Sequence, residues 1–472
     1  MTDNIDFTSI TSFRTKDEFS SFEGDFTTLE ILNPVIRTLD TETFTQEIRF
    51  TGETDRFSWL VGGFYFDETA DVGYDITYGA DTRAFVDYVA TDLAGDVPLV
   101  DPSPLLTIEF LQGEDFNSYF SEGRGTQGSI VQDNQQFSIF AQTDIYITDR
   151  LVLTLGVSYF DDEKEVSIAT ARNNTFTDID LLNFAGGVGL PLQPVQVLDS
   201  VTDFPNSVEG NSTSDSDYPY TIRAAYDVTD RTNVYISYAT GFKASSWALN
   251  ENSRPFAADL AALGAANLLN ENTAFAQTAI DPDSYAGTRF AGPEDTTSIE
   301  IGLKTSWDWG SLNFAAFDQT IEGFQSQIFQ GTGFILTNAG EQSVRGFEFD
   351  TNIQPFEGLT LTWAGTYLDA EYDEFLIGNG PPNADNLNGT IVDLSGTEPA
   401  GIPEFSSSFG VDYRRDYSFG EAFIRADYQY ESDVQVIDNV PADVASREVN
   451  QVNASVGVNM ENGFEALLWS RN

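Results

Sequence analysis

The residues with the most chemical potential in this sequence are its carboxylates, because 75 Asp and Glu stand against 22 Lys and Arg. Close pairs of carboxylates are the groups that hydrolyse glycosides or bind Ca²⁺. Four acidic clusters have such spacing: Asp161/Asp162/Glu163, Asp215/Asp217, Asp281/Asp283 and Glu371/Asp373/Glu374. None of them follows an EF-hand or a calcium-binding nonapeptide pattern. We therefore interpret the clusters as solvated loop charge, with divalent-ion binding as the alternative.

Other kinds of chemistry lack their residues. The chain has no His and no Cys, which excludes a Ser-His-Asp triad, thiol chemistry and disulfides. The glycine run at 186–189 lacks the Lys-Ser/Thr ending and the strand-to-helix context of a phosphate loop. A net charge of −53 argues against nucleic-acid binding. We expect no enzyme active site, no cofactor and no bound metal.

The bulk composition indicates a folded chain. Hydrophobic residues make up 41% and aromatic residues 13% of the sequence, which is too rich for disorder. The first residues lack the basic segment and the apolar segment that are typical of a signal peptide. No window of the sequence is apolar enough for a transmembrane helix. Two classes remain: a soluble all-β protein, and a transmembrane barrel whose strands leave only a weak hydropathy signal.

Period-two alternation recurs along the chain and predicts strands with one apolar and one polar face. Between 151 and 159, for example, the odd-numbered residues are Leu, Leu, Leu, Val and Tyr, whereas Thr154, Gly156 and Ser158 lie between them. The same pattern occurs at 298–304, 405–413 and 452–459. Alternation alone does not distinguish a barrel in lipid from a sheet in water.

The lengths of the strands and of their connections do distinguish the two classes. We count about fifteen strands, most of them roughly 10 to 14 residues long, against the ~5–6 usual in globular sheets. Short and long connections alternate, as they do in an outer-membrane barrel with periplasmic turns and extracellular loops. The short ones are Gly52–Asp55, Thr148–Asp149, Thr229–Arg231, Asp308–Gly310, Pro355–Gly358, Asp416–Gly420 and Glu461–Gly463. The long ones are 67–135, 163–217, 243–295, 323–342, 371–403 and 432–448.

The distribution of cations and aromatic residues fits the same architecture. Aromatic residues cluster near strand ends, as in interfacial girdles, although ordinary β-propensity explains them equally well. Cations are scarce on the apolar faces of the best strands. Those on the polar, lumen-facing parity are Arg49, Arg223, Lys304 and Arg425. We predict that they pair with lumenal carboxylates, with contact to a plug or an anionic ligand as the alternative.

Several stretches resemble the barrel of TonB-dependent receptors, among them FSIFAQTDIYITDRLVLTLGVSYFDDEKE (137–165), YDVTDRTNVYISYATGFK (226–243) and SIEIGLKTSWDWGSLNFAAF (298–317). Similar matches occur at 43–68, 337–375, 402–413 and 452–472. The resemblance implies a transmembrane antiparallel up-and-down barrel of roughly 22 strands around an N-terminal plug. Residues 1–472 would then form a partial barrel domain, roughly the seventh to twenty-first strands, and we expect the signal peptide, energy-coupling box, plug and last strand to be absent.

The resemblance also implies a function. A TonB-dependent receptor lies in the outer membrane of a Gram-negative bacterium and takes up a scarce nutrient, typically a ferric siderophore. Its partners would be outer-membrane lipid, the TonB complex and a plug in the same polypeptide. Ligand contacts are expected in the long loops, where the candidates are Tyr74, Tyr78, Phe110, Tyr119, Trp247 and Tyr285. The apolar stretch 256–269 has near-helical spacing and forms either a short helix over the mouth or a packed loop.

Two hypotheses from other classes stay open at this point. One is a passive outer-membrane channel or structural barrel without a plug. The other is an extracellular acidic adhesin, for which repeats of fixed period are expected and are not found beyond the hairpin rhythm.

Overall fold

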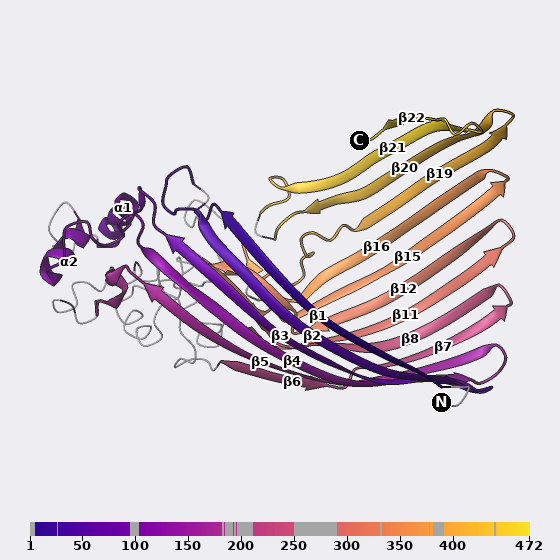
Figure 1. Cartoon of the computed structure of the whole chain (residues 1–472), viewed down its shortest axis with the longest axis horizontal. Helices are drawn as coiled ribbons and strands as arrows, with labels where there is room; N and C mark the ends of the chain where they lie inside the picture. Colours follow the sequence, from indigo (N-terminus) through magenta and orange to yellow (C-terminus); the bar gives the residue numbers. More distant parts are fainter. Residues whose placement is uncertain are drawn as a thin grey trace.

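A single curved antiparallel sheet dominates the computed structural model of the chain (Figure 1). Fifteen strands follow one another in a continuous path, and each pairs with the next strand of the path along the sequence; β6 adds a sixteenth strand beside β5. The prediction of about fifteen antiparallel strands is therefore confirmed. The structure describes residues 5–25, 27–94, 103–181, 184, 192, 195, 211–249, 290–330, 333–376, 378–380, 391–438 and 440–472.

The strands of the large sheet are β1 (Ile5–Phe22), β2 (Val35–Glu53), β3 (Phe57–Thr77), β4 (Gly125–Tyr146), β5 (Leu151–Arg172), β6 (Ser212–Asp217), β7 (Tyr220–Thr229), β8 (Thr232–Lys243), β11 (Glu294–Trp307), β12 (Gly310–Glu322), β15 (Glu341–Phe356), β16 (Leu359–Glu374), β19 (Phe405–Tyr417), β20 (Gly420–Gln435), β21 (Ser446–Met460) and β22 (Glu465–Ser470). Short hairpin sheets in the loops are formed by β9 (Ser246–Trp247) with β10 (Phe290–Ala291), β13 (Gln325–Gln330) with β14 (Gly333–Asn338), and β17 (Gly378–Asn379) with β18 (Ile391–Val392). The helical elements are α1 (Thr82–Ala94), α2 (Pro104–Gln112) and the 3₁₀ turn η1 (Thr175–Asp178).

All short connections lie at one end of the sheet and all long ones at the other (Figure 1), as predicted. We call these the turn end and the loop end. Three of the turns repeat the sequence Thr-Asp-Arg, beginning at Thr54, Thr148 and Thr229. In each, the threonine hydroxyl accepts a hydrogen bond from the backbone N–H of the arginine two residues later. This local bond closes the turn without help from the rest of the sheet.

The two faces of the sheet differ in polarity near the turn end. On one face, which we call the outer face, large apolar side chains are exposed, such as Ile139, Val157 and Ile301, with exposed fractions of 51%, 51% and 59%. Strand register carries this face across neighbouring strands, since Ile139 lies opposite Tyr159 and Ile301 opposite Ile236. The outer-face segments 57–65, 137–145 and 151–159, with their paired neighbours, form what we call the belt. Nine residues per strand match the ~9–11 needed to cross a bilayer when tilted.

Aromatic residues mark both limits of the belt. At the loop-end limit, the hydroxyls of Tyr65 and Tyr159 donate to Asp67 and Asp161, at 2.7 and 2.9 Å. At the turn end the rings of Trp307 and Trp309 meet edge to face, with centroids 5.1 Å apart. Amphipathic rings at the two ends of an exposed apolar surface are typical of interfacial girdles.

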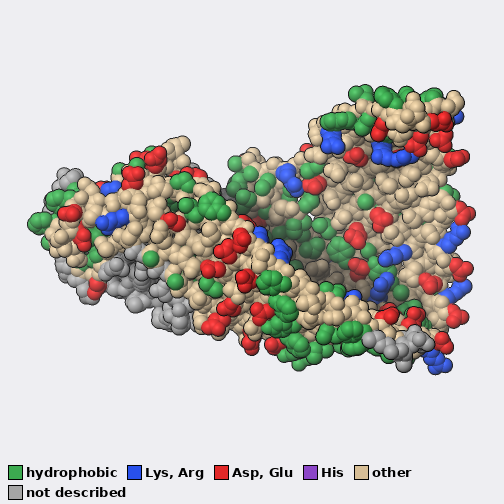
Figure 2. Space-filling model, in the orientation of Figure 1, with side chains coloured by type: hydrophobic (Ala, Val, Ile, Leu, Met, Phe, Trp, Pro, Cys, Tyr) green, Lys and Arg blue, Asp and Glu red, His purple; other side chains and the backbone are tan. Residues whose placement is uncertain are grey.

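Beyond the belt the polarity of the faces reverses. On β3 the outer face carries Asp67, Thr69 and Asp71 above the limit of the belt, while the inner face carries Val72, which is 1% exposed. Figure 2 shows acidic side chains on the long strands between the belt and the loop end. Above the lipid the outer face meets water, so apolar side chains gain stability only on the inner face, where other segments cover them.

This reversal corrects the predicted loop boundaries. The connection expected at 67–135 spans only 78–124, and the one expected at 163–217 begins after Arg172. Strands β1–β5 have 18 to 22 residues rather than the predicted 10 to 14. The expected boundaries fall where one apolar face ends, whereas the hydrogen-bonded ladder continues with the faces exchanged.

The sheet is open along two edges. Among the described residues, β1 pairs only with β2 and β22 only with β21, so the strands form a trough in Figure 1. No helix in the described part of the chain is long and apolar enough to cross a membrane.

The belt predicts a strong dependence on which face carries a charge. Ala141 lies on the outer face at mid-belt, and its neighbour Gln142 lies on the inner face. We expect Ala141→Arg to lower the free energy of unfolding in lipid vesicles by about 2–4 kcal/mol, because the cation faces the bilayer midplane. Gln142→Arg is the matched control and should change little in the same denaturant titration. Equal losses from both variants would contradict the assignment of the faces.

Candidate functional site

The inner face of the belt is polar and is tied together by bonds between strands. Three asparagine side chains donate across strand pairs to aspartates: Asn233 to Asp227 at 2.8 Å, Asn313 to Asp350 at 3.0 Å and Asn453 to Asp427 at 2.7 Å. Asp144 accepts from Thr154 at 2.6 Å in the same way. These bonds hold the carboxylates against the wall, which gives a rigid, negatively charged lining suited to hydrated solutes rather than to apolar ones.

The four cations predicted to face the lumen all lie on the inner face by strand register. Two of them pair with carboxylates as predicted: Arg425 with Asp412 at 2.6 Å and Arg49 with Glu47 at 3.3 Å.

The pairing prediction is wrong for the other two, Arg223 and Lys304. Within the described residues neither forms an ion pair, and both lie over the ring of Tyr235, at 4.3 and 5.8 Å from its centroid.

Near the loop end, the inner face of the long strands is apolar and covered. Val72, Ile130 and Val166 pack with Tyr74 and with Trp247, which comes from the β9/β10 segment (residues 244–249 and 290–293). The indole N–H of Trp247 donates to Thr213 at 3.0 Å, and Arg37 donates to the carbonyl of Leu249 at 3.1 Å. The β9/β10 segment is therefore held against the inner wall above the belt.

The connections that follow β8 and β12 are joined by a separate hydrogen-bond network. Asn338 donates to the carbonyls of Gly292 and Gly323, and Gln325 donates to the carbonyls of Ala244 and Gly292. These bonds connect the β9/β10 segment with the β13/β14 hairpin. Further along the mouth, Tyr372 packs against Phe375 and Ala339, with Leu394 beside them. The Tyr372 hydroxyl donates to Asp438 at 3.1 Å, where burial raises the pKa of the phenol.

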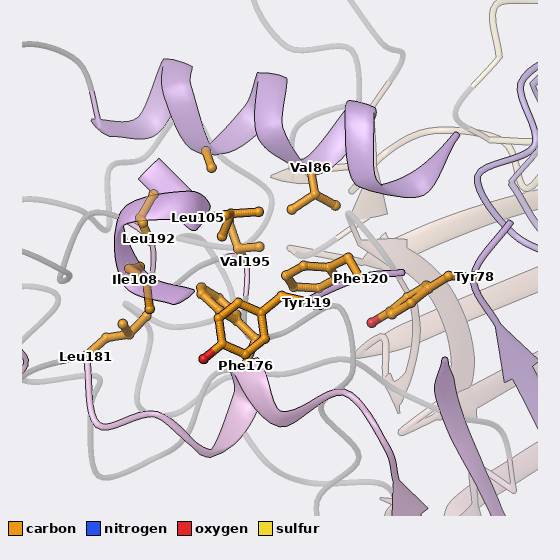
Figure 3. Packing of buried hydrophobic residues seen from close by; sticks show 11 residues of the cluster. Tyr78, Val86, Leu105, Ile108, Tyr119, Phe120, Phe176, Leu181, Leu192 and Val195 are labelled. Atoms are coloured by element: carbon orange, nitrogen blue, oxygen red, sulfur yellow. The ribbon is translucent and has the colours of Figure 1, made fainter. Parts of the chain in front are cut away.

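The β3–β4 connection and residues that follow β5 together form a small helical cap with one shared core (Figure 3). Val86 of α1, Leu105 and Ile108 of α2, and Tyr119, Phe120 and Phe176 from the surrounding loops are almost completely buried. No prediction placed helices here. The signals were present in the sequence, because Ser103 caps α2 and Pro104 begins it, while Gly113 ends it with φ 73°.

A buried ion pair organises this cap. Arg83 contacts Glu109 at 2.5 Å, and the Glu109 side chain is 0% exposed. The remaining lone pairs of Glu109 accept the backbone N–H groups of Asn117 and Tyr119, at 2.9 and 3.0 Å. The loop that follows α2 passes through positive φ at Asn117 and Phe120, so these bonds hold a backbone that is otherwise unfavourable.

Most of the aromatic candidates for ligand contact are structural. Tyr74, Tyr78, Tyr119 and Trp247 are all less than 8% exposed and belong to the two clusters above the belt. Phe110 is 71% exposed on the surface of the cap and keeps its candidacy. Tyr285 lies outside the described residues, as do the stretch 256–269 and the glycine run at 186–189.

The acidic clusters behave mainly as loop and wall charge. Asp161 and Glu163 lie on the outer face above the belt, whereas Asp162 is buried beside Lys164; burial raises the pKa of Asp162, and Lys164 opposes that rise. Asp215 accepts the backbone N–H of Ser245 at 2.9 Å. No group of three acidic residues in the described part of the chain is arranged to hold a metal ion, and 281–283 lies outside that part.

Comparison with known proteins identifies the architecture. The family described as TonB dependent receptor-like, beta-barrel matches residues 2–469. The chain belongs to the TonB-dependent receptors. Members of this family are transporters rather than enzymes and lie in the outer membrane of Gram-negative bacteria. The predictions that the chain is not an enzyme and that it lies in the outer membrane are thereby confirmed.

Solved structures share the fold of this receptor barrel at low sequence identity. The ferric yersiniabactin uptake receptor FyuA from Yersinia pestis is 12% identical with a TM-score of 0.63, and the alignment covers 100% of this chain and 54% of FyuA. The siderophore receptor PiuA from Acinetobacter baumannii is 16% identical with a TM-score of 0.59, covering 99% and 58%. The copper transporter OprC is 10% identical with a TM-score of 0.58, covering 97% and 55%. The chain thus spans little more than half the length of these structures. No curated protein matches.

The buried ion pair of the cap yields a stability prediction. We expect Glu109→Gln to destabilise the cap by about 3 kcal/mol, because it leaves Arg83 with a weaker partner in a buried site. The measurement is hydrogen exchange of the backbone amides in 103–120, which should accelerate while exchange in the belt stays slow. Asp308→Asn, which removes the exposed pair with Arg231, is the control. Unchanged exchange in 103–120 would show that the ion pair does not organise the cap.

The buried phenol of Tyr119 yields a pH prediction. Burial, with the charges of Glu114 and Glu109, raises the pKa of Tyr119 to about 12, against about 10 for a free phenol. A raised pKa stabilises the folded cap fully below pH 10, and this contribution is lost as the pH rises toward 12. The difference in absorbance at 295 nm between the receptor and Tyr119→Phe should therefore titrate near pH 12. Tyr88→Phe on the cap surface is the control, and a Tyr119 midpoint near 10 would contradict the packing.

Proposed function

We propose that the chain is the wall of an energised importer for a scarce nutrient, with a ferric siderophore or similar iron complex as the favoured substrate. The observation that carries the proposal is the combination of an exposed apolar belt, a polar inner face and a loop segment packed on the inner wall at the loop end. Loops positioned on a rigid scaffold are where a receptor can place its ligand contacts.

The substrate class is supported by what the similar structures are named for. FyuA takes up ferric yersiniabactin, PiuA is a siderophore receptor and OprC transports copper. The rigid, carboxylate-rich wall adds support for a hydrated metal complex over an apolar solute. Phe110 on the cap is our candidate for first contact with such a ligand.

The partners follow from the same proposal. A plug in the same polypeptide would fill the trough, and TonB would supply the energy through a segment outside residues 1–472. Outer-membrane lipid would contact the belt. The wall described here would contain the ligand path rather than drive it.

A growth experiment tests the importer. The gene is deleted, and uptake of iron-55 is measured under iron limitation with ferric citrate, a ferric hydroxamate and a ferric catecholate. Uptake of at least one complex should fall to background in the deletion strain and also in a strain without active TonB.

Two results would contradict the proposal. Uptake that persists without TonB identifies a passive channel. A deletion with no phenotype on iron, copper, cobalamin and glycans excludes a role in importing those nutrients.

A further inference from the structure

The outer face of the belt carries a groove that crosses four neighbouring strands, β3, β4, β5 and β7, and has a volume of about 430 Å³. We call it the belt groove. Strand register aligns its lining side chains into two parallel tiers, which form the walls. One tier is Trp59, Thr143, Leu155 and Ile222, and the other is Val61, Ala141, Val157 and Tyr220. The residues between the tiers turn their side chains to the inner face, so their backbone forms the floor: Leu60, Gln142, Gly156 and Thr221.

The belt groove is narrow and short. Outer-face neighbours on one strand are ~7 Å apart along the chain, so the walls stand one pleat apart. From β3 to β7 there are three strand spacings, which gives a length of ~14 Å. An α-helix with its side chains is ~10–12 Å across and is too wide to enter. A single hydrocarbon chain is thin enough to lie between the tiers.

Side-chain size makes the outer face hollow at this place. Ala141 and Thr143 of β4 are the smallest members of their tiers, so both walls are low at the middle of the groove. The outer face of β12, β15 and β16 has the opposite relief. There the rings of Phe314, Phe347 and Tyr367 stack, with centroids 6.0 and 5.5 Å apart, and form a ridge.

The groove is held in shape and is apolar at its middle. The ring of Trp59 lies against Gly52, where a Cβ atom would come within 2.6 Å of it, so the ring is fixed at the β3 end. The hydroxyl of Thr143 donates to the carbonyl of Ser58 at 2.9 Å and is not free for a ligand. Tyr220 stands at the β7 end, where its ring lies 5.9 Å from that of Tyr238. The two ends are therefore marked by amphipathic rings, with apolar walls between them.

The surroundings identify the occupant. The belt groove is continuous with the face that meets the hydrocarbon of the outer membrane, so lipid chains reach it and water does not. An empty groove would forfeit the dispersion contacts that a chain makes with both walls and the floor. A chain against the flat part of the belt contacts protein on one side only.

We propose that the belt groove holds one acyl chain of an outer-membrane lipid and retains it longer than the chains around the rest of the belt. The inference rests on the outer-membrane barrel and does not depend on which substrate is imported.

Quenching of tryptophan fluorescence tests the proposal. The full receptor is purified in detergent, and a phospholipid with brominated acyl chains, which quench tryptophan on contact, is added in excess. The signal of Trp59 is the difference between receptors with and without Trp59→Phe. Trp363, which is 48% exposed on the outer face, is the reference and is isolated in the same way with Trp363→Phe.

Two further variants change the outer face. Ala141→Leu fills the middle of the groove, and Ala426→Leu on the outer face of β20 is the matched control. The shift in gel mobility on boiling confirms folding, and Ala141→Val replaces the leucine variant if that variant does not fold. Mass spectrometry of each purified receptor identifies any lipid that it retains.

We expect quenching of Trp59 to be several-fold slower than that of Trp363, because the resident chain must leave first. Ala141→Leu should make the two rates equal and remove the retained lipid, whereas Ala426→Leu should change neither. Equal rates in the unaltered receptor would overturn the retained chain. Slow quenching that survives Ala141→Leu would show that protein shields Trp59, which also overturns it. A resident polypeptide, or a molecule without an acyl chain, would overturn the choice of occupant.

Discussion

A strand inside hydrocarbon has no water to satisfy its N–H and C=O groups, so it must give every one of them to a neighbouring strand. The rest of this structure depends on that requirement. It explains why consecutive strands pair without crossovers, why the ladder continues through the whole belt, and why the turns can be as short as Asp308-Trp309. It also leaves the side chains to decide which face meets lipid, since the backbone is the same on both.

The exchange of faces above the belt converts the same strands into a different kind of structure. Within the belt, Val157 points outward and Ser158 inward; farther along β5, Glu165 points outward and Val166 inward. The apolar inner surface created by this exchange would be exposed to water in the mouth. It is instead covered by Trp247 and its neighbours, so the loops have a hydrophobic reason to fold inward. The packing of this loop on the inner wall is thus a consequence of carrying long strands out of the membrane.

The two arrangements of the faces, within and above the belt, explain which features could be predicted from the sequence. Alternation and turn residues are local signals, and they located the strands, the turn end and the inner-face positions of Arg49, Arg223, Lys304 and Arg425. The ends of β3 and β5 could not be predicted from one apolar face, because the faces exchange at Asp67 and Asp161. The burial of Tyr74 and Tyr119 depends on loops that meet only in three dimensions. The stacking of Arg223 and Lys304 on Tyr235 depends on the register of β7, β8 and β11, which single-strand patterns do not contain. The helix α2 could have been found from Ser103, Pro104 and Gly113.

The loops divide into units that differ in how firmly they are held. The cap has a closed core and an ion pair at Glu109, so it forms a small unit of its own at the loop end of the long strands β3–β5. The hairpin β13/β14 is bordered by the apolar cluster around Tyr372 and is held by hydrogen bonds from the side-chain amides of Gln325 and Asn338 to backbone carbonyls. The β9/β10 segment is attached both to the long strands and to the hairpin. Trp247 packs on β3–β5, and the backbone N–H of Gly292 donates to the side chain of Asn338. Movement of the described β9/β10 residues away from either neighbour must therefore break one of these two attachments. The amide hydrogen bonds expose less apolar surface when broken than the packing around Trp247 does, so separation from the hairpin costs less than separation from the wall.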